Sequence, residues 1–288
     1  LSLVGSEMCI RDREAHRIWL PPLPPVIELS SLDMEGAEST AAELSAPIGI
    51  IDRPYYQRQD HLVIDFHQHG GHLALCGGPQ SGKSGALRTI VSSLALHLRP
   101  EDIRFYVIDL GGGQLAALDR LPHVAGVAGR EEGEKIRRIV DEVAGFIRRP
   151  ESRETFLVID GWHHIGPSNA EFEDIAESIT DIVADGASAN VHVVIATSRW
   201  TTMRPAIRDL IAHRLELRLG EALDSLIDRK LQQKLPSAPG RGLTQAGENM
   251  LLAHTSNQDI AHICRVHANA VPTPRLKMLP CLLYTSDA

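Results

Sequence analysis

Eight consecutive residues, GGPQSGKS at 77–84, combine glycines with a lysine and a serine in an order that suits phosphate binding. Glycines let backbone amides curl inward and point at phosphate oxygens without a Cβ in the way. In the pattern G-x-x-x-x-G-K-[ST], Lys83 is expected to reach the β- and γ-phosphates of a nucleotide, and Ser84 is expected to offer its hydroxyl to Mg²⁺. The stretch therefore predicts a site for ATP and Mg²⁺.

We expect the nucleotide to contact the whole loop and the residue that follows it. The helix that begins at Lys83 should direct its free amides and its positive dipole end at the same anion. A chance match to a glycine-rich turn is the alternative, which the strand–loop–helix context disfavours. The predicted nucleotide-binding residues of the loop are Gly77, Gly78, Pro79, Gln80, Ser81, Gly82, Lys83, Ser84 and Gly85.

The apolar run TFLVID ends in Asp160, which we interpret as the second metal-binding residue and, with Lys83, as a catalytic residue. Asp109 ends the similar run FYVID and is the alternative. In-line hydrolysis needs a group that orients and deprotonates the attacking water, and a glutamate usually follows the metal-side aspartate. Here Gly161 follows it. The sequence therefore predicts that binding survives and turnover is weak.

Five further residues are candidates, and for the first four there is also a plain structural alternative. His163 or His164 could replace the missing glutamate, although histidines past a strand end more often face solvent. Thr197 and Arg199 follow the next strand, where they could sense the γ-phosphate or belong to a loop that caps the sheet. Arg241, in APGRG, could reach a neighbouring subunit.

Short apolar runs alternate with helical patterns along the chain. This alternation predicts right-handed βαβ crossovers and an α/β fold, with a mostly parallel sheet covered by helices on both faces. The expected strands are 61–66, 71–78, 103–110, 155–160, 191–198, 213–219 and 249–254, and the run at 213–219 alternates as if one face were more exposed. The expected helices are 83–98, 131–148 and about 171–185.

The composition argues against several classes of protein. The formal charge is −8, and Lys and Arg form no run longer than a pair, which argues against a surface built mainly for nucleic acid. The four cysteines lie far apart and form no CxxC pair, as expected for free thiols in a reducing compartment. No apolar run approaches the roughly 20 residues of a membrane span. We expect a cytosolic protein.

A cluster of three histidines, His67, His69 and His72 in HQHGGH, could bind a metal ion, but such loop spacing is more often incidental.

The two ends of the chain show no continuity with their neighbours. We expect residues 1–13 and 281–288 to be non-native flanks and exclude them from the fold. Residues 14–46 form a proline-rich lead-in, 47–256 the ATPase domain, and 257–280 a linker toward a following domain.

Several motifs together resemble the FtsK/SpoIIIE group of P-loop motors and, within it, the EccC ATPases of type VII secretion. They are WLPPL, GIIDRPYYQRQD, GGPQSGKS, IRFYVIDLGGGQLAALDRLPHVAGVAGR, FLVIDGW, VHVVIATSRW, RPAIRDLIAHRLELRLG and PGRGLT. The resemblance covers roughly residues 16–255 and is strongest to the second of the three tandem ATPase domains, because RIWLPPL is similar to its lead-in. The family usually has an insertion between the 131–148 helix and the Asp160 strand, where RRPESRET is short.

The resemblance implies a RecA-like P-loop domain, held at the inner face of the cell membrane in a secretion complex. It implies a homo-hexamer, neighbouring ATPase domains, membrane-embedded secretion components and WXG-type secreted substrates as partners. In this family the second and third domains commonly bind nucleotide with little turnover, and DGW fits that pattern at Asp160 and Gly161.

Two other functions stay open from the sequence. An FtsK-type DNA translocase would need a basic channel and the glutamate, and neither is evident, so DNA is not an expected partner. A nucleotide-independent interaction module would not need an intact loop with Lys83 and Ser84.

Overall fold

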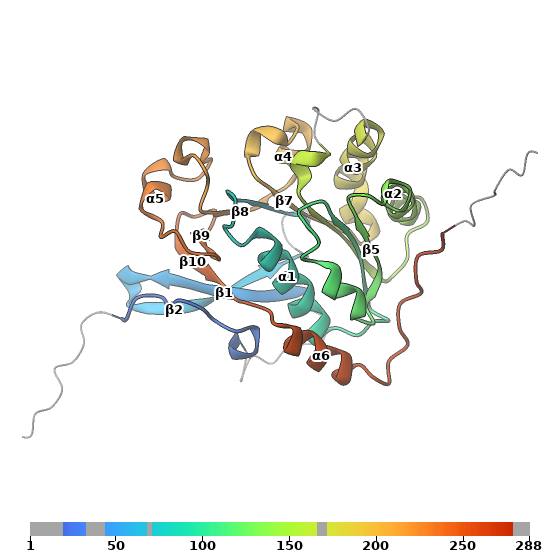
Figure 1. Cartoon of the computed structure of the whole chain (residues 1–288), viewed down its shortest axis with the longest axis horizontal. Coiled ribbons are helices and arrows are strands. Elements are labelled where there is room, and N and C mark those ends of the chain that lie inside the picture. Colours follow the sequence, from blue (N-terminus) through green and yellow to red (C-terminus); the bar gives the residue numbers. More distant parts are fainter. Residues whose placement is uncertain (1–19, 33–43, 68–70, 166–171, 279–288) are drawn as a thin grey trace, which may run out of the picture.

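Apolar runs separated by helices form a ten-stranded sheet within the part of the chain that the computed structural model describes, residues 20–32, 44–67, 71–165 and 172–278 (Figure 1). The strand order is β2-β1-β10-β9-β8-β3-β7-β6-β4-β5. Among the described residues, no helix is long and apolar enough to cross a membrane.

Six of these strands run parallel and make up one half of the sheet. They are β3 (Leu73–Cys76), β4 (Ile103–Asp109), β5 (Val124–Gly129), β6 (Glu154–Asp160), β7 (Val191–Thr197) and β8 (His213–Leu217). Every residue of β3, β4 and β7 is buried, as expected for strands covered on both faces. The carboxyl ends of these strands meet at one edge of the sheet, which is where ligands bind in such folds.

The other half is antiparallel and begins where β9 joins β8. It contains β1 (Ser45–Arg53), β2 (Arg58–Asp65), β9 (Arg241–Leu243) and β10 (Asn249–Leu252). The segment before β1 lies against this half, since Glu28 bridges to His254 just beyond β10. The segment before β1 therefore lies beside the residues that follow β10, on the antiparallel half of the sheet.

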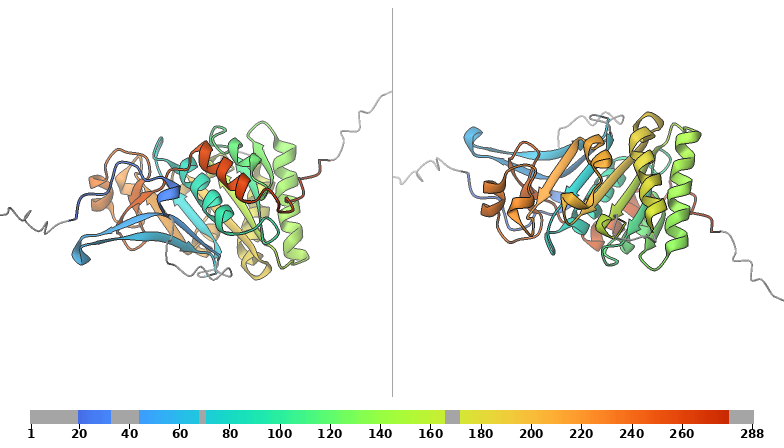
Figure 2. Two further views of the ribbon diagram at one scale, coloured as in Figure 1. Left: turned by 90° about the horizontal axis from the view of Figure 1, so that it is seen from below. Right: turned by 90° about the horizontal axis from the view of Figure 1, so that it is seen from above.

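Helices cover both faces of the parallel half, as predicted. On one face lie α1 (Lys83–His97) and α6 (Asn257–Val266), and on the other lie α2 (Gly133–Arg148), α3 (Glu173–Asp185) and α4 (Pro205–Leu210) (Figures 1 and 2). Each face has its own apolar cluster, one built around Leu87 and Ile90 of α1 and the other around Ile139 and Ile179 of α2 and α3. A further short helix, α5 (Arg229–Lys234), lies outside these layers.

The expected alternation at 213–219 holds except at one residue. Arg214 is half-buried and Arg218 is exposed, as a more exposed face predicts, but Glu216 on the same face is completely buried. Its carboxylate accepts hydrogen bonds from Trp200 Nε1 (2.7 Å), Ser225 Oγ (2.6 Å) and the amide of Leu226 (2.8 Å). A buried carboxylate is tolerated when its oxygens are paired in this way, and alternation alone does not reveal such partners.

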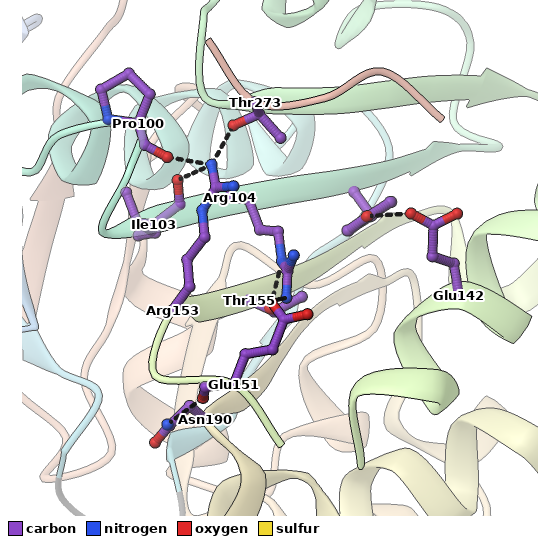
Figure 3. Close-up of polar contacts among 10 residues, drawn as sticks. Pro100, Ile103, Arg104, Glu142, Glu151, Arg153, Thr155, Asn190 and Thr273 are labelled. Carbon is purple, nitrogen blue, oxygen red and sulfur yellow. Dashed lines mark hydrogen bonds and ion pairs between the residues drawn. The ribbon is translucent and has the colours of Figure 1, made fainter. Parts of the chain in front are cut away.

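A network of arginines occupies the amino ends of the strands, opposite the phosphate loop (Figure 3). Arg104 donates to Thr155 Oγ1 and Glu151 Oε2, both at 2.8 Å, and its guanidinium lies 3.5 Å from the ring centroid of Phe146. Arg153 donates to the carbonyl oxygens of Pro100 and Ile103 and to Thr273 Oγ1. The short RRPESRET segment thus supplies Glu151 and Arg153 to the fold.

The last described residues run along β5, the strand at one end of the sheet. The amide of Thr273 donates to Pro122 O (2.8 Å) and that of Leu276 to Ala125 O (2.9 Å), while Arg275 pairs with Asp119 at 2.7 Å. We call residues 271–278 the C-terminal strap. The predicted boundary between domain and linker after residue 256 remains a prediction; α6, which follows it, packs on α1 through Ile260 and Ile263.

Candidate nucleotide-binding site

The loop between β3 and α1 has the backbone shape that its glycines predict. The amide of Gly77 donates to Thr197 O (3.1 Å) and that of Gly78 to Arg218 O (2.8 Å), which fixes the start of the loop to neighbouring chain segments. Gly82 has a φ of +99°, and a Cβ there would lie 2.8 Å from the amide nitrogen of Gly240. Only glycine combines this φ with such a close backbone contact.

Lys83 begins α1 and turns its side chain back into the loop. Its Nζ donates to Gly77 O (2.8 Å) and Gly78 O (2.7 Å). Burial lowers the pKa of Lys83, and the nearby Asp160 carboxylate opposes that shift. An ammonium with reduced solvation and only neutral carbonyl acceptors is well suited to an incoming phosphate.

Ser84 and Asp160, 76 positions apart in sequence, meet beside the loop. The Ser84 hydroxyl donates to Asp160 Oδ2, and the Asp160 side chain is almost completely buried. Burial raises the pKa of Asp160, whereas the Ser84 hydrogen bond works in the opposite direction. Gly111 leaves room for this carboxylate, since a Cβ there would clash with Asp160 Oδ2.

The structure separates Asp160 from its competitor Asp109. The two residues are register partners on β6 and β4. The Asp109 carboxylate accepts the amides of Gly111 (3.1 Å) and Leu115 (2.8 Å), so it shapes its own loop. The Asp160 carboxylate faces the loop serine instead. The metal role of Asp160 remains a prediction. Its hydrogen-bond partner, Ser84, is the other predicted metal ligand.

Gly161 stands in a backbone conformation that favours glycine. Its φ is +76° and its ψ is +38°, and it precedes the short helix η5 (Trp162–His164). A Cβ at this position would lie 2.9 Å from the carbonyl carbon of Leu110 and 3.0 Å from the amide nitrogen of Gly111. A glutamate in place of Gly161 would therefore be strained by both its backbone and its contacts.

His163 and His164 lie directly beyond Gly161, with their ring centroids 4.1 Å apart. Burial lowers the pKa of His163 to about 4, helped by the neighbouring His164 and Lys83, so this imidazole is neutral near pH 7. The Cδ2 atom of His164 is 3.2 Å from the place that a Cβ of residue 161 would take. Their substitution for a glutamate remains a prediction.

Thr197 and Arg199 are placed differently from each other. Thr197 is buried and shares a 2.7 Å hydrogen bond with Thr202 Oγ1, while its carbonyl oxygen holds the loop at Gly77. Arg199 is largely exposed, and its Nε lies 3.8 Å from Asp224. Thr197 thus supports the loop through its backbone, and sensing of a γ-phosphate by either side chain is still a prediction.

Two other sequence candidates have structural roles of their own. Arg241 donates within this chain, from Nη2 to the carbonyl oxygens of Leu23 and Pro24, both at 2.7 Å. His72 Nδ1 accepts the amide of Val193 at 3.0 Å. Within the described ranges no three His, Cys, Asp or Glu side chains form a metal-binding group; His69 of the histidine cluster lies outside those ranges.

The residues present fit a nucleotide with its metal ion. The amides of the first turn of α1 have no acceptor within the helix, and the Lys83 ammonium lies against Gly77 O and Gly78 O of the same loop. The Ser84 hydroxyl and the Asp160 carboxylate are oxygen ligands of the kind that Mg²⁺ prefers. Sequence reasoning gave the proline-rich segment before β1 only as a lead-in and missed that it lines a pocket beside the loop. The run PPLPPV shows the segment but not its position.

Comparisons with known proteins show which proteins this chain resembles. The chain is 37% identical to the ESX-4 secretion system protein EccC4 of Mycobacterium tuberculosis over 92% of its own length, and 38% identical to the ESX secretion system protein EccC of Thermomonospora curvata over 87%. It spans only 23% and 22% of those relatives.

Two solved structures from Thermomonospora curvata have the same fold. One is the cytoplasmic domain of the type VII secretion ATPase EccC, with a TM-score of 0.85 and 34% identity over 93% of this chain and 37% of that one. The other holds ATPases 2 and 3 of EccC in complex with a signal sequence peptide, with a TM-score of 0.83 and 33% identity over 91% of this chain and 56% of that one. Residues 34–262 match the FtsK/SpoIIIE family, and this P-loop chain belongs to it.

Proposed function

We propose that this chain is an ATP-binding domain of a type VII protein secretion motor, with weak or regulatory hydrolysis. The observation that carries the proposal is the hydrogen bond between Ser84 and Asp160 beside a phosphate loop that holds Lys83. Mg²⁺, when bound there, would neutralise phosphate charge. Lys83 and the loop amides would hold the phosphates.

Weak turnover is inferred from Gly161. A glycine supplies no carboxylate to orient and deprotonate water, and its positive φ and close contacts disfavour a side chain at that position. His163 and His164 lie on the same turn, and His163, neutral near pH 7, could accept a proton slowly.

The secretion role rests on similarity to EccC proteins, of which this chain spans less than a quarter. We infer that the domain works with adjacent ATPase domains in a homo-hexamer at the inner face of the cell membrane, together with membrane-embedded components. A similar structure, of Thermomonospora curvata EccC, holds a signal sequence peptide, which supports a secreted protein as the substrate. We infer that the substrates are WXG-type proteins.

The test is an ATP titration on the purified chain by calorimetry, with steady-state turnover measured in parallel. Lys83→Ala should abolish binding, and Lys230→Ala, which removes an exposed ammonium on α5, is the matched control. Micromolar binding with turnover far below about 1 s⁻¹ is the expected result. Brisk hydrolysis that disappears in Lys83→Ala would refute weak turnover, and absence of ATP binding would refute the proposal.

A further inference from the structure

A pocket of about 450 Å³ opens beside the phosphate loop, on the side away from Asp160. Three segments form it: the loop and first turn of α1, the β9–β10 region, and the proline-rich segment, which we define as residues 20–28. Its lining is mainly apolar, and its volume falls in the range of small-molecule sites. The residues of its lining that matter here are Pro25, Val26, Gly82, Gly85, Pro239 and Leu251.

The position of the metal residues tells which end of a nucleotide would face this pocket. Ser84 and Asp160 mark the β- and γ-phosphate end, and Asp160 belongs to β6. The pocket instead contacts β10, which lies on the other side of β3 in the sheet order. A nucleotide stretched along the loop amides therefore directs its ribose and base toward the pocket.

Gly85 provides the opening between the loop and the pocket. A Cβ at Gly85 would meet no atom within 4 Å, so the first turn of α1 leaves free space there. A second cavity, of about 310 Å³, touches the loop at Gly78 and Gln80, but none of its lining comes from α1. The larger cavity is the one that continues from the helix amides.

The proline-rich segment is held in place as the outer wall of the pocket. Arg241 Nη2 donates to Leu23 O and Pro24 O, both at 2.7 Å. The amide of His254 donates to Ile27 O at 2.7 Å, which extends the attachment along the segment. Val26 is 58% exposed even though it lines the pocket, so it has surface left to cover a ligand.

The same arginine is connected to the phosphate loop through one residue. The amide of Gly240 donates to Ser81 O at 2.9 Å, and the carbonyl of Gly240 accepts the amide of Leu252 at 2.9 Å. Arg241 follows directly in β9. A continuous set of hydrogen bonds therefore joins the loop, β9 and the proline-rich segment.

We propose that this pocket receives the purine base and ribose of the nucleotide, and that Arg241 is a positioning residue that holds the proline-rich segment as the outer wall of the base site. This inference rests on the proposed ATP binding. Its consequence is that the segment before β1 contributes to nucleotide affinity. A change in how that segment is docked changes how tightly the domain holds ATP.

The experiment compares ATP with inorganic tripolyphosphate, which has the phosphates but no base. Both are titrated by calorimetry, with Mg²⁺, into the wild-type chain and into Arg241→Met, Val26→Ser and Leu20→Ser. Leu20 is an exposed residue of the proline-rich segment that does not line the pocket, so Leu20→Ser is the matched control. Arg241→Met and Val26→Ser should weaken ATP binding by about fivefold and leave tripolyphosphate within about twofold.

The outcomes separate this inference from the function on which it rests. If the wild-type chain binds neither compound, ATP binding itself is wrong. If it binds ATP and tripolyphosphate equally well, or if Arg241→Met weakens both by the same factor, the loop binds phosphate and the base site is refuted. A loss confined to ATP, absent in Leu20→Ser, supports the base site, because a purely structural defect would affect both compounds.

Discussion

The two edges of the parallel sheet use charged residues in opposite ways. At the amino ends of the strands, Arg104 and Arg153 are surrounded by fixed partners, including a carboxylate, hydroxyls, carbonyls and an aromatic ring (Figure 3). At the carboxyl ends, Lys83 donates to two carbonyl oxygens within the described part of the chain, and Asp160 accepts the hydroxyl of Ser84. The difference distinguishes charges that hold the fold together from charges that are available to a ligand.

Positive φ angles occur at both edges, but more of them lie at the carboxyl ends. Gly82, Gly112, Gly113 and Gly161 have positive φ near the carboxyl ends of β3, β4 and β6. At the amino ends, Gly71 precedes β3 and Asn190 precedes β7 with positive φ. Asn190 donates its side-chain amide to Glu151 O at 2.9 Å, so this left-handed residue is held by the network around Arg104.

Acidification should affect the structural edge most, and this is the largest effect that we expect. His72 and His123 precede β3 and β5, and burial lowers the pKa of each from 6.5 to about 4. Below pH 6.5 the unfolded chain binds protons that the folded protein excludes, so stability falls as the pH falls from 6.5 toward 4. At pH 5 each histidine should cost about 2 kcal/mol.

Urea unfolding at pH 7.5 and pH 5 measures this loss. His123→Gln keeps a donor near Leu98 O, which the imidazole contacts at 2.9 Å, and should reduce the difference between the two pH values. His262→Gln, at an exposed position of α6, is the matched control. An unchanged difference in His123→Gln would show that other groups cause the acid sensitivity.

At the carboxyl edge of the sheet, Asp160→Asn should weaken ATP binding without lowering the stability of the fold. Removing the carboxylate should weaken ATP binding in Mg²⁺ by about 100-fold, with little effect when Mg²⁺ is chelated. Stability should hold or rise, since burial raises the pKa of Asp160 and so disfavours its charge. Calorimetric titrations with and without EDTA, together with thermal melts, measure both.

Asp109→Asn is the matched control for that variant. It weakens the acceptor of the Leu115 and Gly111 amides, so it should lower stability without removing the Mg²⁺ dependence. The opposite pattern, with Mg²⁺ dependence lost only in Asp109→Asn, would transfer the metal role to that residue.

Gly161→Glu should not restore an active motor. We expect it to destabilise the fold by about 2 kcal/mol, because of the positive φ and the contacts with Leu110 and Gly111, and to leave turnover low. Comparing the stability loss of Gly161→Ala with that of Gly113→Ala isolates the cost of the close contacts at residue 161. Gly113 has a similar φ of +82°, but a Cβ there would have no atom within 4 Å. Fast turnover in a stable Gly161→Glu protein contradicts this account.

Arg153→Met should give the smallest of these effects and act only on stability. Losing donors to Pro100, Ile103 and Thr273 should cost about 1.5 kcal/mol. ATP affinity should not change, because the network lies at the far edge of the sheet. Arg99→Met, which removes an exposed pair with Asp102, is the control. A matching loss of ATP affinity in Arg153→Met would mean that the two edges communicate.

Much of the parallel half could be predicted from the sequence, because most of its strands are continuous apolar runs, α1 has apolar residues at helical spacing, and α2 and α3 are amphipathic. The strand β5 was missed because VAGVAG consists of small residues whose burial depends on α2 and the C-terminal strap. Likewise β1 contains Pro47 and Gly49, which weaken a strand pattern, and its position is fixed by pairing with β10, some 200 residues away.

In the candidate site, too, local motifs could be predicted from the sequence, whereas long-range contacts could not. The loop motif identified Lys83 and Ser84 directly, since local spacing determines a phosphate loop. The sequence favoured Asp160 over Asp109 as the metal-binding residue, but both end similar strands, and only the structure shows how their partners differ. The metal role of Asp160 stays a prediction. The wall formed by the proline-rich segment depends on a contact from Arg241 across more than 200 positions, and no local pattern encodes that distance.

The C-terminal strap has a consequence for solubility. A terminal strand of a sheet normally presents a row of unsatisfied amides and carbonyls, which can recruit a foreign chain. In this protein Thr273 and Leu276 occupy part of that row along β5, and Arg275 adds a charge beside it. A variant in which the strap detaches would therefore expose β5 as an edge strand and tend to form fibrous aggregates, even with its nucleotide site intact.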